Sequence, residues 1–223
     1  MEHEEHESQQ YNYRRFAHRF PSKYDQINKQ LKKFSDLTNH WEPRSDIWYC
    51  KYGNLIAGGF AGLSAVLIGY RFRKFFKLGQ QQQAFFNVYM PLLTVPLMMN
   101  SLAHLVWTTL PILSKEQKCP ICINIKSSSL QTFFSTIYPV IFGGVSSAYF
   151  ARYFNTYPFP DDLKDKSNRR YILNEIIKGL RKNKVIFGVI GLSNFLVAWY
   201  IAQQEQESMI IMTYKLNKSL QEN

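Results

Sequence analysis

The sequence predicts an all-α membrane protein with four transmembrane helices and short amphipathic helices outside the bilayer. Apolar residues gather in four blocks, at residues 54–70, 84–113, 130–151 and 185–202, and none of them contains Asp, Glu, Lys or Arg. A run of about 18 or more uncharged apolar residues is long enough to cross a bilayer as a helix. The mean hydropathy of -0.26 hides this pattern because it averages the blocks with polar segments.

The blocks divide the chain into four regions. We expect a disordered, partly acidic arm over residues 1–20, a pre-membrane segment over 21–53, a transmembrane domain over 54–203 and a polar tail over 204–223. The four spans are expected at about 54–70, 86–108, 130–151 and 185–203. Buried hairpins of a soluble protein are the alternative, but so short a chain has too little polar surface to cover four apolar blocks.

Prolines in the second block set a condition on its packing. Pro91, Pro96 and Pro111 lie within or at the end of that block. Lipid offers no water to the carbonyl groups that a proline leaves without a donor, so neighbouring helices or local adjustments must compensate. We therefore expect the second span to be packed against other parts of the protein.

Lysine and arginine predict the orientation in the membrane. They are concentrated between the first and second blocks and between the third and fourth. The positive-inside bias puts these two loops on one side, and both termini with the loop at 114–129 on the other. The net charge of +11 is thus explained by topology and by anionic lipid headgroups, without nucleic acid as a partner. The basic residues taken to mark this side are Arg71, Arg73, Lys74, Arg169, Arg170, Arg181 and Lys182.

Two amphipathic stripes lie outside the blocks. Ile27, Leu31 and Phe34 have helical spacing, and a second stripe precedes the fourth block. Each helix could lie on the membrane surface, dock on a partner or pack against the protein's own loops. The second stripe consists of Ile172, Leu173, Ile176, Ile177 and Leu180.

Small residues recur at every fourth position in the first and third blocks. Such faces let helix backbones approach closely, so that close contacts hold helices together in lipid. The neighbour could be another helix of this chain or a foreign one, and internal packing is slightly favoured. The helix-packing residues are Ala57, Gly58, Ala61, Gly62, Ala65, Gly143, Gly144 and Ser147.

The blocks offer few groups for chemistry or ion transport. His104 is accompanied by only three amide side chains, Asn87, Asn100 and Asn194. A transporter normally carries ionisable groups within the membrane, and a single histidine is more often an interhelical hydrogen-bonding group. We find no phosphate-binding glycine loop, zinc-protease motif or nucleophile with its base. We therefore expect no enzymatic activity, catalytic residue, metal or cofactor.

The polar loop "SKEQKCPICINIKSSS" at residues 114–129 contains Cys119 and Cys122. With Cys50 and His40 they could form a Cys3His zinc site, although such sites usually use two cysteine pairs. A thioredoxin-like centre would need an α/β domain. Two free thiols are also possible. An outward, oxidising compartment favours a Cys119–Cys122 disulfide, whose closure of so short a loop would fix the chain only locally.

Several motifs in this order resemble one known family. The CxxC loop is followed by a serine-rich helix entry, then Tyr138-Pro139-Val140 and Ala151-Arg152-Tyr153, and the first block ends in "RFRKFF". Residues 45–203 thereby resemble the transmembrane protein 126 family, whereas the arm before residue 20 and the tail after 205 match nothing.

The resemblance implies a function that composition alone does not. Members of this family are multi-pass proteins of the mitochondrial inner membrane that help to assemble the membrane arm of respiratory complex I, and none is known as an enzyme. The implied partners are membrane-arm subunits and other assembly factors, besides membrane lipid. The Cys119–Cys122 loop and both termini would then face the intermembrane space. An accessory subunit of complex I and a small multi-pass transporter are the alternatives.

Overall fold

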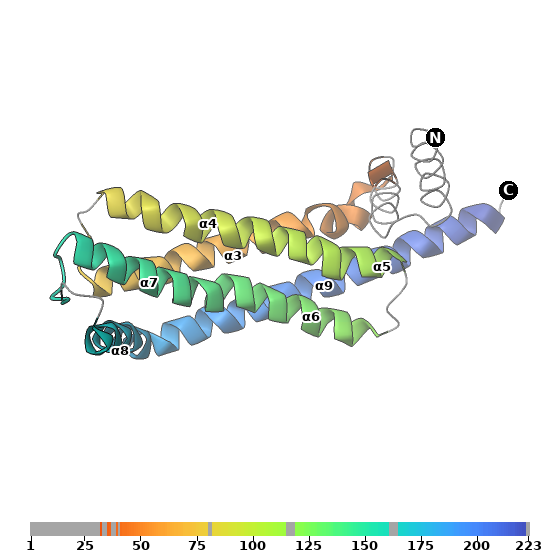
Figure 1. The fold of residues 1–223 in the computed structure, drawn as a ribbon. Helices are drawn as coiled ribbons and strands as arrows, with labels where there is room; N and C mark the ends of the chain where they lie inside the picture. The colour runs from red at the N-terminus through yellow and green to blue at the C-terminus, as the bar shows by residue number, and fades with distance from the viewer. Residues whose placement is uncertain are drawn as a thin grey trace, which may run out of the picture. The chain divides into compact units, whose positions relative to one another are not determined.

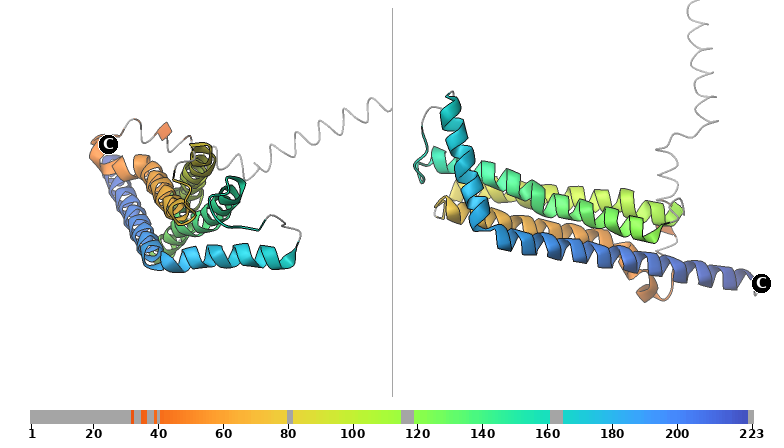
Figure 2. Two further views of the ribbon diagram at one scale, coloured as in Figure 1. Left: turned by 90° about the vertical axis from the view of Figure 1, so that its left-hand side faces the viewer. Right: turned by 90° about the horizontal axis from the view of Figure 1, so that it is seen from below.

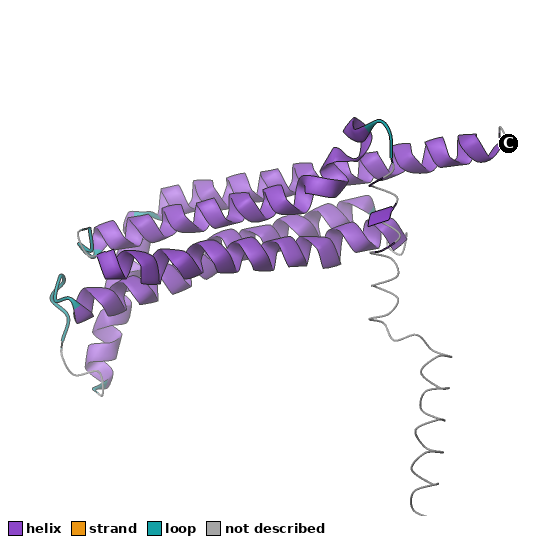
Figure 3. Cartoon of the chain, turned by 90° about the horizontal axis from the view of Figure 1, so that it is seen from above, coloured by secondary structure: helices purple, strands orange, loops and turns teal. Residues whose placement is uncertain are grey.

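Long helices make up the part of the chain that the computed structural model describes (Figure 1). The described residues are 32, 35, 36, 39, 41–79, 82–114, 119–160 and 165–221. Within them the structure has no strand, which confirms the all-α prediction (Figure 3). Four helical stretches are long and apolar enough to span a membrane, as the four blocks predict. The stripe Ile27, Leu31 and Phe34 lies outside the described residues.

The helical stretches that contain the four candidate spans extend beyond the apolar blocks at both ends. A 3-10 turn, η1 (Arg44–Ile47), leads into α3 (Trp48–Phe75), which is the first span. The second comprises α4 (Gln82–His104), η2 (Leu105–Thr109) and α5 (Leu110–Ser114), and the third comprises α6 (Pro120–Thr132), η3 (Phe133–Ile137) and α7 (Tyr138–Tyr153). The fourth is α9 (Lys184–Gln221), preceded by α8 (Lys166–Lys182).

The C-terminal region of the structure differs from the sequence prediction. The sequence predicts that the fourth span ends near residue 203 and that a polar tail follows, but α9 continues as one helix to Gln221. Buried side chains recur along this continuation, at Glu205, Ser208 and Met212. Because these positions keep the three- and four-residue spacing of one helix face, residues 204–212 extend the packed face of the fourth span.

The second and third spans each contain a π-helical turn that lies just before a proline. Pro111 follows η2 and Pro139 follows η3, in both cases by two residues. A proline has no backbone N–H, and its ring clashes with the carbonyl four residues earlier. Those carbonyls belong to Trp107 and Ser135, inside the two π-helical turns. A wider turn relieves the clash without ending the helix, which keeps each span continuous through the bilayer.

Helix α3 is the central element of the bundle and contacts α4, α7 and α9 (Figures 1 and 2). Its neighbours approach closely because the inward positions carry glycine, alanine or serine. Toward the C-terminal end of α3 the buried side chains become large, with Ile68, Phe72 and Phe76 fully buried. There they join Ala148, Ala151 and Phe187 in the largest apolar cluster described.

Helix α8 lies across the end of the bundle at this cluster (Figure 2). Asp165 caps it, because its carboxylate accepts hydrogen bonds from the backbone N–H and the hydroxyl of Ser167. Gly179 lies against the rings of Phe75 and Phe72, and partly buried Ile176, Ile172 and Leu180 pack on the same cluster. The second predicted stripe therefore packs, at least in part, against the protein's own spans.

A polar contact fixes α8 to the loop that precedes it. Buried Glu175 accepts a hydrogen bond of 2.8 Å from the Tyr157 hydroxyl and one of 2.6 Å from Lys178 Nζ. The hydrogen bond from Lys178 holds the pKa of Glu175 below its usual value. Burial and the neighbouring carboxylate raise the pKa of Tyr157 to about 12. The ionised Glu175 and the neutral phenol thus stabilise each other's position.

Candidate functional site: a polar network between the spans

Two acid–base side chains meet inside the bundle. His104, the last residue of α4, places Nε2 3.0 Å from Oε1 of Glu205 in α9. Only 4% of His104 and 1% of Glu205 is exposed. Thr109 of η2 donates to the other carboxylate oxygen at 3.3 Å, and Ser127 of α6 lies 3.1 Å from His104 Nδ1. With its proton on Nε2, the imidazole donates to Glu205 and accepts from Ser127, so every polar atom of the ring is satisfied.

Gly53 of α3 makes room for this carboxylate. A Cβ at position 53 would lie 2.6 Å from Oε1 of Glu205 and 3.0 Å from the Ile201 side chain. A Cβ atom does not approach other atoms that closely, so a larger residue would displace Glu205 from His104. The small residue at position 53 therefore serves the polar site as well as the packing of α3 on α9.

A second polar cluster, formed by amide side chains, lies further along the bundle. Gln131 donates through Nε2 to the Ala57 carbonyl at 2.9 Å and to Asn194 Oδ1 at 3.3 Å, and its own oxygen accepts from Asn100. Asn194 in turn donates to Ser64 Oγ and to the Ile190 carbonyl, both at 2.8 Å. Gln131 and Asn194 are almost completely buried. The cluster joins the first, second, third and fourth spans.

These contacts stabilise and orient the bundle. A polar group in hydrocarbon must find a partner within the protein, so each interhelical hydrogen bond favours one register of two spans over its neighbours. Ionisable residues within a membrane are costly and mark functional sites by default. The chemistry that His104 and Glu205 could supply is proton exchange between an imidazole and a carboxylate. Among the described residues, no group of three His, Cys, Asp or Glu side chains is placed to hold a metal ion.

The small residues predicted for helix packing contact other helices of the same chain. Gly58 of α3 faces Ser101 and Leu97 of α4, and a Cβ added there would lie 2.7 Å from the Leu97 carbonyl oxygen. Gly62 faces Leu93 and Leu97, and its added Cβ would lie 3.1 Å from the Leu93 carbonyl oxygen. In α7, Gly143 lies against Gly69 and Leu92, and Gly144 against Phe72 and Ile176. The other packing candidates, also buried, are Ala57, Ala61, Ala65 and Ser147.

Cys119 and Cys122 lie at disulfide-bonding distance, with Cα atoms 5.4 Å apart, at the exposed start of α6. The backbone N–H of Cys122 also donates to Cys119 Sγ, which makes Cys119 the N-terminal cap of α6. Cys50 is a free, buried cysteine whose thiol donates to the backbone carbonyl of Glu205. His40, the fourth member of the zinc hypothesis, lies outside the described residues.

The basic residues gather at the end of the bundle where α8 lies, but Arg73 is different from the rest. Its side chain is buried, with 4% exposed, and donates to the Leu78 carbonyl at 2.7 Å. The guanidinium also lies over the rings of Tyr89 and Phe85, at 5.3 and 5.7 Å. Arg73 thus fastens the end of α3 to α4. The others are half-buried, as Arg71, or exposed, as Lys74, Arg169, Arg170, Arg181 and Lys182.

Sequence reasoning identified part of the network and missed its acidic half. The sequence identifies His104, Asn100 and Asn194 as polar groups of the apolar blocks, and the structure brings all three into interhelical contacts. The predicted polar tail contains Glu205, and nothing in the local sequence distinguishes Gln131 from its neighbours. The signal for Glu205 is its spacing of 11 residues from Asn194 in the sequence, because three helical turns return to the same face.

Comparison with known proteins places the chain in a family. The family model of transmembrane protein 126 matches residues 24–212. A Drosophila melanogaster protein named Transmembrane protein 126 is 25% identical over 187 residues, which cover 83% of this chain and 82% of that protein. No solved structure is significantly similar. This match shows that the chain belongs to the transmembrane protein 126 family, and its four helices that could span a membrane indicate a multi-pass membrane protein.

Proposed function

We propose that this protein is a non-catalytic scaffold of the mitochondrial inner membrane that helps to assemble the membrane arm of respiratory complex I. The observation that carries the proposal is membership of the transmembrane protein 126 family over residues 24–212. The partners are membrane-arm subunits and other assembly factors. In the proposed orientation, both termini and the Cys119–Cys122 loop face the intermembrane space, and the end that carries α8 faces the matrix.

The bundle has properties that suit such a scaffold. Its polar side chains and small-residue faces are used for contacts within the chain, so the four spans hold each other in a fixed arrangement. The outward faces are apolar, with exposed residues such as Leu63, Met98, Ile141 and Leu192. In a membrane these faces meet lipid or hydrophobic subunits, and a rigid bundle presents the same faces to each incoming subunit.

The decisive experiment combines a knockout with purification of the tagged full chain. Cells without the protein should accumulate membrane-arm intermediates, and the tagged protein in mild detergent should co-migrate with membrane-arm subunits in sub-complexes smaller than complex I. Normal assembly of complex I in the knockout would rule the proposal out. Stable co-migration with the mature complex would instead identify an accessory subunit.

The buried pair of His104 and Glu205 favours one second candidate, a small transporter, because ionisable groups inside a membrane often mark a transport path. That function requires flux of a proton or solute into liposomes that contain the purified protein. Flux that disappears in both His104→Ala and Glu205→Gln, while the variants remain folded, would favour transport over scaffolding. Wild-type liposomes that are no more permeable than empty ones would exclude it.

The orientation has its own test. Cys119 and Cys122 are exposed, whereas Cys50 is buried. After mild reduction, a membrane-impermeant maleimide should label the pair in mitochondria whose outer membrane is opened and whose inner membrane is intact. Labelling that requires rupture of the inner membrane would reverse the proposed orientation.

A further inference from the structure

The N-terminal half of α8 is far more exposed than its C-terminal half. Both buried residues of the helix, Glu175 and Gly179, belong to the half that packs on the bundle. From Lys166 to Asn174 most side chains are exposed, including 42% of Tyr171 and 55% of Leu173. In Figure 2 this half extends across the end of the bundle, away from the junction with α9.

The depth of α8 in the membrane follows from its position next to the fourth span. Asn183 alone separates α8 from α9, and the membrane-spanning stretch of α9 begins at Lys184. The helix therefore lies at the level where the fourth span leaves the apolar part of the bilayer. A helix that lies across the spans at this level runs along the membrane surface, where amphipathic basic helices bind lipid.

Two adjacent rows of exposed or half-buried side chains suit that environment. Lys166, Arg170 and Asn174 are four residues apart and form a polar row along the helix. Leu173 and Ile177 form an apolar row beside it, and neither is buried. Cations beside apolar side chains match the phosphate and acyl regions of a phospholipid, which meet at this depth.

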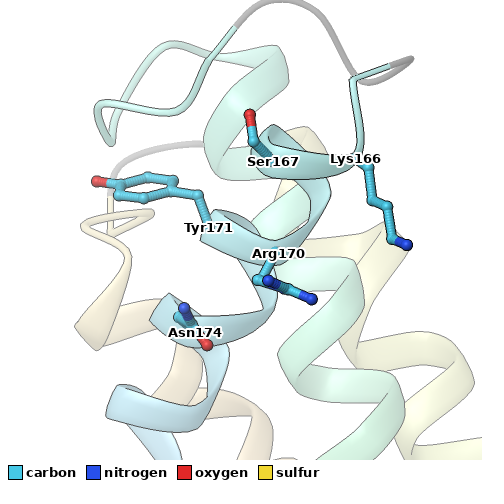
Figure 4. Close-up of a pocket in the computed structure, with 5 residues that line it drawn as sticks. All are labelled: Lys166, Ser167, Arg170, Tyr171 and Asn174. Carbon is cyan, nitrogen blue, oxygen red and sulfur yellow. The ribbon is translucent and has the colours of Figure 1, made fainter.

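A hollow on the polar row has the size and the donors for a headgroup. It measures about 430 Å³ and is lined by Lys166, Ser167, Arg170, Tyr171 and Asn174 (Figure 4). Figure 4 shows these side chains around one side of α8. An ammonium, a guanidinium and an amide are donors that bind phosphate oxygens, and the guanidinium can do so with two parallel hydrogen bonds. The acid nearest in sequence, Asp165, is held by Ser167.

From these observations we infer that the N-terminal half of α8 binds an anionic phospholipid, with the phosphate between Lys166 and Arg170 and an acyl chain along Leu173. The apolar row, with Leu173 exposed and Ile177 half-buried, argues for a lipid rather than free phosphate, because inorganic phosphate gains nothing from either side chain. The inference does not depend on the proposed assembly function, since it concerns only how this end of the bundle meets the bilayer.

Native mass spectrometry of the full chain in an uncharged detergent tests the inference. The probes are phosphatidylglycerol and phosphatidylcholine with identical acyl chains. Wild-type protein should bind phosphatidylglycerol clearly more tightly than phosphatidylcholine. The double variant Lys166→Gln/Arg170→Gln should bind phosphatidylglycerol about 30-fold less tightly, from the usual contribution of two basic residues near an anionic surface.

Matched variants distinguish lipid binding in the hollow from a general effect of positive charge at this end of the bundle. Lys74→Gln/Lys184→Gln removes two exposed cations from the same end of the bundle but outside the hollow, and should bind as the wild type does. Lys166→Arg/Arg170→Lys keeps both charges and should retain most of the binding. Because all four positions are exposed, each variant should also keep the wild-type thermal midpoint, which is checked first.

Four binding results would overturn the inference. They are equal binding of the two lipids, unchanged binding in Lys166→Gln/Arg170→Gln, an equal loss in Lys74→Gln/Lys184→Gln, and displacement of phosphatidylglycerol by millimolar inorganic phosphate. The last would identify a site for free phosphate. A fall in thermal midpoint that parallels the fall in binding, with no recovery in Lys166→Arg/Arg170→Lys, would show that the two residues support the fold instead.

Discussion

His104 Nε2 lies 3.0 Å from Glu205 Oε1, a contact that joins the second span to the fourth across 101 positions of the sequence. The pair is enclosed by Ser127 and Thr109 and by the backbone of Gly53. A buried partner that is removed leaves the other group without its hydrogen bond, and the cost of this loss usually exceeds the net gain from forming it. Removal of either side chain should therefore destabilise the bundle.

Replacement of Glu205 by alanine should destabilise the protein by about 1–3 kcal/mol, because His104 and Thr109 lose their buried acceptor. Thermal unfolding of the purified protein in mild detergent measures the loss. Glu207→Ala is the matched control, since Glu207 is an exposed glutamate of the same helix that contacts only Gln203 and Gln204 among the described hydrogen bonds. Equal effects of the two substitutions would contradict the buried contact.

A double-mutant cycle isolates the contact itself. If His104 and Glu205 interact as described, His104→Ala combined with Glu205→Ala should cost clearly less than the sum of the two single substitutions. Strict additivity would mean that each side chain acts through other neighbours.

Substitution of Gly58 should damage the packing of α3 on α4, whereas the same substitution at Gly59 should not. A Cβ at position 58 would overlap Ser101 Oγ and lie 2.7 Å from the Leu97 carbonyl, while nothing lies within 4 Å of a Cβ at position 59. Overpacking of this kind costs about 1–3 kcal/mol. We expect Gly58→Leu to lower the steady-state amount and the thermal midpoint, and Gly59→Leu to leave both unchanged. The reverse order would show that the face around Gly59 is the packed one.

Position 143 should accept alanine but not leucine. Its added Cβ would meet Gly69, Leu92 and Phe72 at ordinary distances of 3.6–3.8 Å, so Gly143→Ala should fold normally. A leucine needs space that those three neighbours fill, and Gly143→Leu should reduce the abundance of the protein. Similar abundance of both variants would mean that α7 can shift away from α3 at little cost.

Cys119 and Cys122 are expected to form a disulfide in the native membrane, as their geometry allows. Alkylation of the denatured, unreduced protein should then modify Cys50 alone, and alkylation after reduction should modify all three cysteines. Cys119→Ser/Cys122→Ser should change thermal stability little, because closure of so short a loop restricts the unfolded chain only slightly. Modification of all three cysteines without reduction would disprove the disulfide.

Glu175 should make the docking of α8 depend on pH. Its folded-state pKa lies below the ordinary value of 4.5, so the ionised form stabilises the fold above pH 4.5, and this contribution is lost as the pH falls through the lowered pKa. Lys178, whose pKa is raised above 10.5, keeps its contribution below that pH. The thermal midpoint of Glu175→Gln should therefore lie below that of the wild type at pH 7, and the difference should shrink below pH 4.5. A difference that is the same at both pH values would contradict the role of the charge.

The sequence by itself determined the four spans and the segments between them. Runs without charged residues must become helices in a bilayer, because only a helix satisfies every backbone group of a single segment. The small residues of α3 and α7 and the amphipathic pattern of α8 were equally local signals. Family membership could also be inferred, since the order of motifs from the cysteine loop to Ala151-Arg152-Tyr153 belongs to the sequence itself.

Only the tertiary structure decided which polar residues meet. Glu205 and Arg73 resemble solvent-exposed charges in the sequence, yet one lies against His104 and the other against Leu78 and Tyr89. Their burial depends on how far each helix continues beyond its apolar block and on which face it turns inward. That choice results from many weak contacts summed over four spans, with no hydrophobic drive to separate helix from lipid, and no local stretch of sequence contains the sum.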